Sequence, residues 1–111
     1  MFKKSDKRTI YYLIIEYLPG KIDESTFCNE FHCSYDLELN YNDLTDEEYK
    51  AFHELGDVSG RFSEYEEDFK NFPGVFYTRK ELKQKVLETK TKLSKYFTEF
   101  INDIEKDGRD K

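Results

Sequence analysis

Cysteine and long apolar runs are both scarce in this sequence. Two cysteines among 111 residues are too few for a disulfide scaffold, and Cys28 and Cys33 are too badly oriented on one predicted helix to bridge without distortion. We expect both to be reduced and mostly buried. No apolar run approaches the ~20 residues that cross a bilayer, and no small-residue cleavage site follows the basic start. The sequence therefore predicts a cytoplasmic protein that does not associate with a membrane.

Tryptophan is absent and proline occurs only twice, but phenylalanine and tyrosine are abundant. Aromatic residues make up 17% of the chain and charged residues 38%. A disordered chain of this charge would lack so many aromatic side chains, so the composition is typical of a folded globular protein. A length of 111 residues predicts a single domain, 1–111, with one hydrophobic core.

The net charge of −6 conceals a strong asymmetry along the chain. Residues 1–22 carry a net charge of +3, and residues 69–111 carry +4. Between them, residues 23–68 hold fifteen acidic and two basic side chains, a net charge of −13. Such a block repels itself at a cost in stability, which favours a functional role for the acidity. A solvated acidic face that maintains solubility is an equally good interpretation.

Helical periodicity dominates the hydrophobic pattern, and no strand-like alternation rivals it. Four helices and a frayed tail are predicted, at residues 5–18, 23–37, 45–62, 78–104 and 105–111. The last helix is several turns longer than average and is expected to be the spine on which the others pack. A tight Pro19-Gly20 connection favours antiparallel neighbours. The fold prediction is therefore all-α, an antiparallel four-helix bundle with a long C-terminal helix.

Three helix starts carry specific capping signals. Asp23 is expected to cap the second helix. Thr45 and Glu48 have the spacing of a capping box, in which the threonine oxygen accepts a backbone N–H and the glutamate reaches back to the cap. Thr78 and Glu81 repeat this spacing at the start of the last helix. These positions anchor the helix boundaries.

The third helix and its exit carry two further packing signals. Gly56 and Gly60 each weaken a helix by ~1 kcal/mol relative to alanine, so we expect close packing at Gly56 and fraying by Gly60. Residues 63–77 are predicted to form a loop around a Pro73-Gly74 turn. Four apolar side chains are expected to tuck this loop against the core: Phe69, Phe72, Val75 and Phe76.

Cys28, His32 and Cys33 have the residue types of a metal site, and Cys28 and His32 stand one helical turn apart. Zinc needs a fourth ligand, and only His53 remains among the soft ligands. Core packing is therefore favoured over a metal site, and no cofactor is expected. A cysteine–histidine nucleophile pair lacks a sequence signature of an oxyanion hole, and there is no glycine-rich phosphate loop. We expect no enzyme activity.

The acidic segment favours binding to a basic partner. Basic residues gather on the last predicted helix, but with a net charge of −6 and no binding motif the chain is not expected to bind nucleic acid directly. Carboxylates along a helix and its exit loop can instead occupy phosphate-like positions on a basic protein. Neighbouring tyrosines offer the rigid area of binding hot spots, although each is equally expected at the core edge: Tyr35, Tyr41, Tyr49 and Tyr65.

Several short motifs of this chain occur in a known family. A G-[KE]-I-[DS]-x-x-x-F connection after the first helix is matched by Gly20-Lys21-Ile22-Asp23 and Phe27. The third helix of the family is matched by Leu44-Thr45, Glu47-Glu48, Phe52 and Leu55. Its last helix is matched by Lys80-Glu81-Leu82-Lys83 and Val86, whereas a D-V-D-x-F-x-P-D stretch is retained only at Asp57-Val58 and Phe62. In this layout, residues 10–97 resemble the self-protective immunity proteins of the colicin D type.

The resemblance implies a four-helix bundle that binds the basic nuclease domain of a bacteriocin or contact-dependent toxin. Acidic groups would block the toxin's active site where RNA phosphates would lie, and the unbound protein would be a monomer. With Tyr65 as an aromatic anchor, the expected contact residues are Asp57, Glu64, Glu66, Glu67 and Asp68. A second rank of contacts comprises Asp43, Glu47 and Glu54. The alternative is an acidic helical adaptor or regulatory module whose partner is not a toxin.

Overall fold

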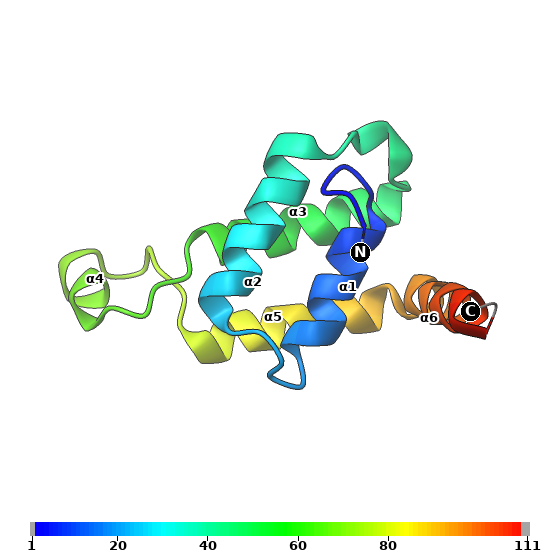
Figure 1. Ribbon diagram of the computed structural model, residues 1–111. Coiled ribbons are helices and arrows are strands. Elements are labelled where there is room, and N and C mark those ends of the chain that lie inside the picture. The colour runs from blue at the N-terminus through cyan, green and yellow to red at the C-terminus, as the bar shows by residue number, and fades with distance from the viewer. Residues whose placement is uncertain (1, 110–111) are drawn as a thin grey trace.

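The computed structural model describes residues 2–109, with side chains described through residue 105. Within residues 2–109 the α-helices are α1 Arg8–Tyr17, α2 Glu24–Phe31, α3 Asp46–Gly60, α4 Glu66–Asn71, α5 Arg79–Lys92 and α6 Ser94–Arg109 (Figure 1). A π-helix, His32–Glu38, extends α2, and a short 3-10 helix, Tyr41–Asp43, precedes α3. No β-strand is present in this part of the chain, so the prediction of an all-α fold is confirmed.

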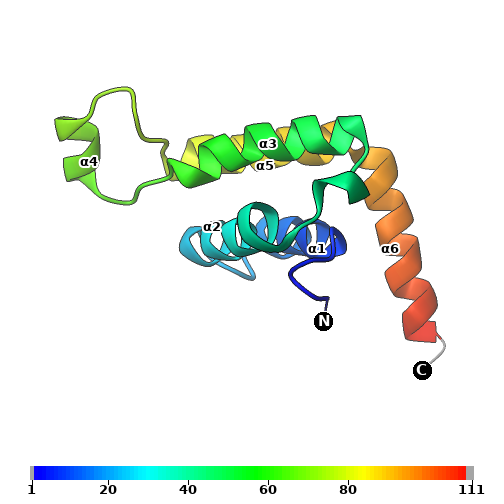
Figure 2. The same ribbon diagram turned by 90° about the horizontal axis from the view of Figure 1, so that it is seen from above.

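The helices form two layers with α6 at one end (Figure 2). α1 and α2 lie side by side in one layer, and α3 lies along α5 in the other. α6 leaves the end of α5 in a new direction and packs against α1. α4 stands apart from both layers at the opposite end of the molecule.

Aromatic rings from several helices build the core. Tyr11 of α1 contacts Phe52 of α3 and Phe97 of α6, with ring centroids 5.4 Å and 4.7 Å away. A second row of rings follows α2 and the π-helix, with neighbouring centroids 5.0 to 5.9 Å apart: Tyr17, Phe27, Phe31 and Tyr35. Removing these rings from water supplies much of the driving force that holds the two layers together.

The predicted capping signals are confirmed. The Asp23 carboxylate accepts a backbone N–H from the first turn of α2 at 2.8 Å. At the start of α3, Thr45 Oγ1 accepts the Glu48 N–H at 3.2 Å and Glu48 Oε1 accepts the Thr45 N–H at 2.9 Å. Thr78 and Glu81 make the same reciprocal bonds at the start of α5, at 3.1 Å and 3.0 Å. Each cap satisfies N–H groups that have no partner within the helix.

Both ends of the helical region differ from the prediction. α1 begins at Arg8 rather than at residue 5, because the Asp6 carboxylate accepts the Arg8 N–H at 2.9 Å and closes a local turn before the helix. The frayed tail predicted at 105–111 is wrong for residues 105–109, which continue α6. Residues 110–111 lie outside the described part of the chain.

The helix predicted at 23–37 divides into α2 and the π-helix. The Leu39 N–H donates to the Ser34 carbonyl at 2.8 Å, which is the five-residue spacing of a π turn. Ser34 is fully buried, and its hydroxyl donates to the Lys4 carbonyl at 2.7 Å. The π-helix therefore presents a buried hydroxyl to the N-terminal segment, a long-range contact that hydrophobic periodicity does not encode.

The long helix predicted at 78–104 is wrong, because the chain turns at Leu93 between α5 and α6 (Figure 2). Leu93 has φ −108° and ψ 26°, which is outside the helical region, and it is 1% exposed. Beyond the turn, the rings of Phe97 and Phe100 lie 4.7 Å and 5.8 Å from that of Tyr11. The change of direction places these rings on α1, and their burial there stabilises the break.

Residues 63–76 project from the helical body, and we refer to them as the acidic lobe (Figure 1). The lobe includes α4 and joins the body through a narrow neck. In the neck, the Ser63 N–H donates to the Tyr77 carbonyl at 3.1 Å, and the Tyr77 N–H donates to the Arg61 carbonyl at 2.8 Å. These two bonds fix the points at which the chain leaves the body and returns to it.

The rings of the lobe pack on one another rather than on the main core. Phe76 contacts Phe69 and Phe72, with ring centroids 6.4 Å and 6.1 Å apart. Phe72 is 55% exposed and Val75 is 43% exposed. The prediction that this segment tucks against the core is therefore wrong, because its aromatic residues form a small cluster of their own.

Close packing at Gly56 is confirmed, and α3 ends at Gly60 rather than at residue 62. A Cβ added at Gly56 would lie 3.4 Å from a ring carbon of Phe31 and 3.8 Å from the ring of Tyr35. We expect Gly56→Ala to change the free energy of unfolding by less than about 1 kcal/mol, since the gain in helix propensity offsets the tight contact. Gly56→Leu should destabilise the protein by about 1–3 kcal/mol, because a larger side chain would push α2 away.

Urea unfolding of the two Gly56 variants measures both effects, with Gly60→Ala as the control. A Cβ at Gly60 would meet no other atom within 4 Å, so this substitution tests helix propensity without a packing contact. Equal stability of Gly56→Leu and the unsubstituted protein would contradict the contact between α3 and α2.

Candidate functional site

Carboxylates gather on the acidic lobe. Glu64, Glu66 and Glu67 are exposed, and none of them forms an ion pair with another residue in the described part of the chain. Glu66, Glu67 and Asp68 occupy the first turn of α4, where the helix dipole favours negative charge. The structure thus brings together four predicted contact carboxylates on a segment that projects into solvent.

The Ser63 side chain links one lobe carboxylate, that of Asp68, to the backbone of Tyr65. Its hydroxyl donates to the Asp68 carboxylate at 2.5 Å and accepts the Tyr65 N–H at 3.0 Å. Ser63 itself is 7% exposed. This buried hydroxyl fixes the backbone at the start of α4 and leaves the Tyr65 ring 69% exposed beside the carboxylates.

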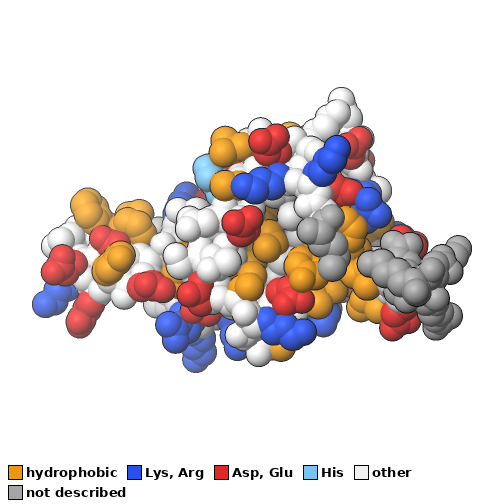
Figure 3. Space-filling view, in the orientation of Figure 1, with side chains coloured by type: hydrophobic (Ala, Val, Ile, Leu, Met, Phe, Trp, Pro, Cys, Tyr) orange, Lys and Arg blue, Asp and Glu red, His pale blue; other side chains and the backbone are white. Residues whose placement is uncertain are grey.

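Exposed apolar side chains accompany the carboxylates on the lobe. Tyr65, Phe72 and Val75 are among the most exposed large hydrophobic side chains of the described residues. Figure 3 shows hydrophobic and acidic side chains next to one another at the tip of the lobe. Exposed apolar side chains that gather on one segment are typical of interaction sites on proteins, and aromatic rings dominate binding hot spots. The exposure of Phe72 and Val75 was missed from the sequence because they were assigned to the core.

Glu47 and Glu54 form ion pairs within the chain. Glu54 lies 3.1 Å from Lys92 Nζ and 3.8 Å from Lys85 Nζ, and Glu47 lies 3.7 Å from Lys95 Nζ. The hydrogen bond from Lys92 holds the pKa of Glu54 below its ordinary value. The basic last part of the chain therefore offsets some of the acidic block along α3, which makes these two carboxylates weaker candidates.

Asp57 and Asp43 are separate from the lobe carboxylates. Asp57 pairs at 3.1 Å with Arg61, which directly follows the end of α3, and both side chains are about half exposed. Asp43 is exposed in the 3-10 helix before α3, next to Lys3 and Lys7. Since α3 has fifteen residues that rise by about 1.5 Å each, Asp43 lies roughly 20 Å from the lobe. One compact surface cannot include all nine predicted residues.

A cleft of about 400 Å³ separates the lobe from α2 and the π-helix. Asp36, Glu64 and Asp68 line it, and Tyr65 stands at the lobe side. His32 also lines the cleft, and its Nδ1 lies 2.6 Å from the Asp36 carboxylate. No lysine or arginine is among the described residues that line this cleft. The acidic surface of the lobe is therefore continuous with a concave site.

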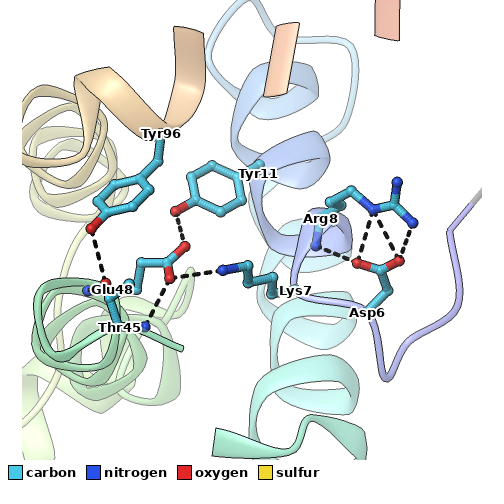
Figure 4. Close-up of polar contacts among 7 residues, drawn as sticks. All are labelled: Asp6, Lys7, Arg8, Tyr11, Thr45, Glu48 and Tyr96. Carbon is cyan, nitrogen blue, oxygen red and sulfur yellow. Dashed lines mark hydrogen bonds and ion pairs between the residues drawn. The ribbon is translucent and has the colours of Figure 1, made fainter. Parts of the chain in front are cut away.

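A buried carboxylate lies at the far end of α3. Glu48 is fully buried, and its carboxylate accepts hydrogen bonds from Tyr11 Oη at 2.5 Å, Lys7 Nζ at 3.0 Å and the Thr45 N–H at 2.9 Å (Figure 4). The Thr45 hydroxyl is in turn 3.1 Å from the Tyr96 hydroxyl. This polar network joins α1, α3 and α6. The sequence predicted only its capping role.

The pKa of Glu48 is lowered although burial acts to raise it, because three donors stabilise the ionised form. Burial of the Tyr11 ring raises the pKa of its phenol, and the hydrogen bond to Glu48 acts in the same direction. The phenol therefore stays protonated and donates. The carboxylate is fully buried and accepts hydrogen bonds from three groups of this chain. Glu48 thus has a structural role and does not belong to the partner-binding surface.

Cys28, His32 and Cys33 do not form a site of reactive geometry. Both cysteines are free and half-buried, and burial raises the pKa of Cys28 to about 12, which keeps its thiol protonated at neutral pH. His32 is oriented by Asp36. Among the residues whose placement is described, no three His, Cys, Asp or Glu side chains converge to hold a metal ion.

No helix in the described range is long and apolar enough to span a bilayer. Comparisons with the known protein families, with curated proteins and with solved structures return no match to this chain. The acidic lobe and the surfaces next to it are therefore the features of the chain that bear on its function.

Proposed function

We propose that this chain is an immunity protein that binds a basic nuclease toxin and neutralises it by covering the toxin's active site. One observation carries the proposal. A projecting segment combines carboxylates that form no ion pair with any described residue and exposed aromatic and aliphatic side chains, as at Glu64, Tyr65 and Phe72. A segment that extends from a rigid body can enter a concave active site, and its carboxylates would lie where nucleic-acid phosphates bind.

The two kinds of side chain on the lobe have different roles in this proposal. The carboxylates steer the encounter with a basic surface and suppress wrong partners. Tyr65 and Phe72 bury apolar area after docking and supply most of the affinity, as aromatic anchors do at other interfaces. Asp57 lies in the last turn of α3, shortly before the lobe begins, so we retain it as a contact at the rim of the proposed interface.

The resemblance to immunity proteins of the colicin D type supports the same function. It implies an antiparallel four-helix bundle, and the all-helical fold of the described residues is compatible with that expectation. In this proposal the protein is a cytoplasmic monomer that requires no cofactor. The lobe would be the element that distinguishes one toxin from another, because the family-like D-V-D-x-F-x-P-D stretch is interrupted at its start.

Co-expression with the product of the adjacent reading frame tests the proposal. We expect that product to be toxic alone, to be tolerated in the presence of this chain and to co-purify with it in a one-to-one complex. The association rate should fall about tenfold or more between roughly 20 mM and roughly 500 mM salt, because electrostatic steering is screened. A rate that is insensitive to salt would contradict the electrostatic mechanism.

The adaptor function gives a different result in the same experiment. A neighbouring product that is neither toxic nor bound would overturn the immunity proposal. Capture of a basic, non-toxic protein through the same lobe would then favour an acidic adaptor or regulatory module. Both functions use the lobe, so only the identity of the partner separates them.

A further inference from the structure

Two glycines of α3 leave space in the cleft between the lobe and the π-helix. It lies beside the C-terminal end of α3, where Gly56 and Gly60 contribute no side chain. A Cβ at Gly60 would meet no other atom within 4 Å, so this position borders open space. Phe62 and Ser63 of the neck also line the cleft, and the hydrogen bond from the Ser63 N–H to the Tyr77 carbonyl holds this segment in place.

Apart from His32, the ionisable side chains of Asp and Glu dominate the lining of the cleft. Asp36 is on the π-helix, whereas Glu64 and Asp68 are on the lobe, so carboxylates face the cleft from two elements. Asp68 is held by Ser63 and Asp36 by His32, but Glu64 has no ion pair among the described residues. Tyr65 also lines the cleft, and most of its surface is exposed.

From this arrangement we infer that the cleft binds an arginine side chain of the partner protein. The inference rests on the proposed function, because it specifies what a basic partner inserts next to the lobe. A planar guanidinium donates to two carboxylates at once and stacks on a tyrosine ring. A volume of about 400 Å³ is ample for one such side chain and the water that accompanies it.

Other occupants fit this cleft less well. A lysine ammonium would find carboxylates but gain less from the exposed Tyr65 ring, since it cannot stack as a plane. An anionic ligand would find no lysine or arginine on the described walls. A metal ion would need three ligands that converge, and no such group exists among the described residues. The combination of separated carboxylates and an aromatic wall selects a guanidinium.

The test uses the whole protein and short synthetic peptides, with no toxin present. The peptides are acetylated, amidated and otherwise made of glycine, with one central arginine, lysine or citrulline. Backbone amide shifts of the labelled protein are followed during titration by NMR. We expect saturable shifts confined to the cleft, a dissociation constant for the arginine peptide about fivefold below that for lysine, and no saturation with citrulline.

Two variants locate the binding and one serves as a control. Glu64→Gln should weaken arginine binding about threefold or more by removing one carboxylate, and Gly60→Leu should abolish it by filling the cleft. Glu105→Gln makes the same charge change on α6 and should leave binding unaltered. Unchanged binding in Glu64→Gln, or equal affinity for arginine and lysine, would overturn the inference.

This outcome is separable from that of the toxin experiment. If the protein binds arginine selectively but the product of the adjacent reading frame is not toxic, the inference about the cleft is supported and the immunity function is refuted. Protection against a toxin without selective arginine binding would support the immunity function and refute the inference that the cleft binds arginine.

Discussion

Replacing Glu64, Glu66 and Glu67 together with lysine is expected to abolish protection against the cognate toxin and to weaken the complex on the order of 100-fold or more. These carboxylates are exposed and have no ion pair within the described chain, so their full charge is available to a basic partner. Reversing them converts attraction into repulsion at the centre of the proposed contact, where like charges cost several kcal/mol. Binding kinetics and cell survival measure the effect.

A matched control separates this local effect from net charge. Lysine at Glu38, Glu99 and Glu105 makes the same change in net charge at exposed positions away from the lobe. We expect this control to lower the association rate modestly and to retain protection. Glutamine at the three lobe positions provides a milder variant that does not oppose the dipole of α4. If the lobe and control variants lose affinity equally, the lobe is not the binding element.

Glu47 and Glu54 on α3 differ from the lobe carboxylates in the same comparison of charged positions. Both carboxylates belong to the acidic block, but they pair with lysines of α5 and α6. A partner would have to displace those lysines before it could use them, so the net gain from contact is small. The distinction between these two glutamates and those of the lobe depends on which helix packs beside α3, which the sequence does not state.

Local signals in the sequence predicted local structure well. The capping boxes at Thr45 and Thr78 and the cap at Asp23 have the geometry expected from their spacing, because each depends on atoms within one turn. Gly56 was assigned to close packing because a glycine inside a helix needs a reason, and Phe31 provides it. The caps are determined by sequence neighbours alone, whereas the sequence indicates that Gly56 is closely packed without identifying Phe31 as its partner.

The predictions that are wrong concern features that depend on contacts between residues far apart in the sequence. Leu93 lies in an uninterrupted helical pattern without proline or glycine, and the turn there is stabilised by rings that pack on Tyr11, far away in sequence. The lobe was placed against the core because an apolar side chain usually seeks one. In the structure, Phe69 and Phe76 find each other instead. Periodicity gives the face of a helix but not the element that covers it.

The candidate site was predicted in part for the same reason. The run Glu64 to Asp68 was identified by composition, and its members are adjacent in sequence, so the structure could hardly separate them. Asp36 was not among the predicted contacts, because only the three-dimensional fold brings the π-helix opposite the lobe.

Glu48→Leu is expected to lower the free energy of unfolding by about 3 kcal/mol. The substitution removes the acceptor for the Tyr11 hydroxyl, the Lys7 ammonium and the Thr45 N–H, and the first of these is buried between α1 and α3. Glu47→Leu is the matched control one residue earlier. Its carboxylate is 61% exposed, so the change should stay within about 0.5 kcal/mol. Urea unfolding at neutral pH measures both.

The pH dependence of Glu48→Gln distinguishes loss of the charge from loss of packing, because glutamine keeps the size of the side chain. The folded protein holds the pKa of Glu48 below its ordinary value of 4.5, so the ionised form contributes stability that is fully present above that value. This contribution is lost as the pH falls through the lower folded pKa. The stability difference between the unsubstituted protein and Glu48→Gln should therefore be constant near neutral pH and shrink below pH 4.5. A difference that stays constant down to about pH 3 would show that Glu48 titrates as an unperturbed carboxyl and that its charge does not hold α1 to α3.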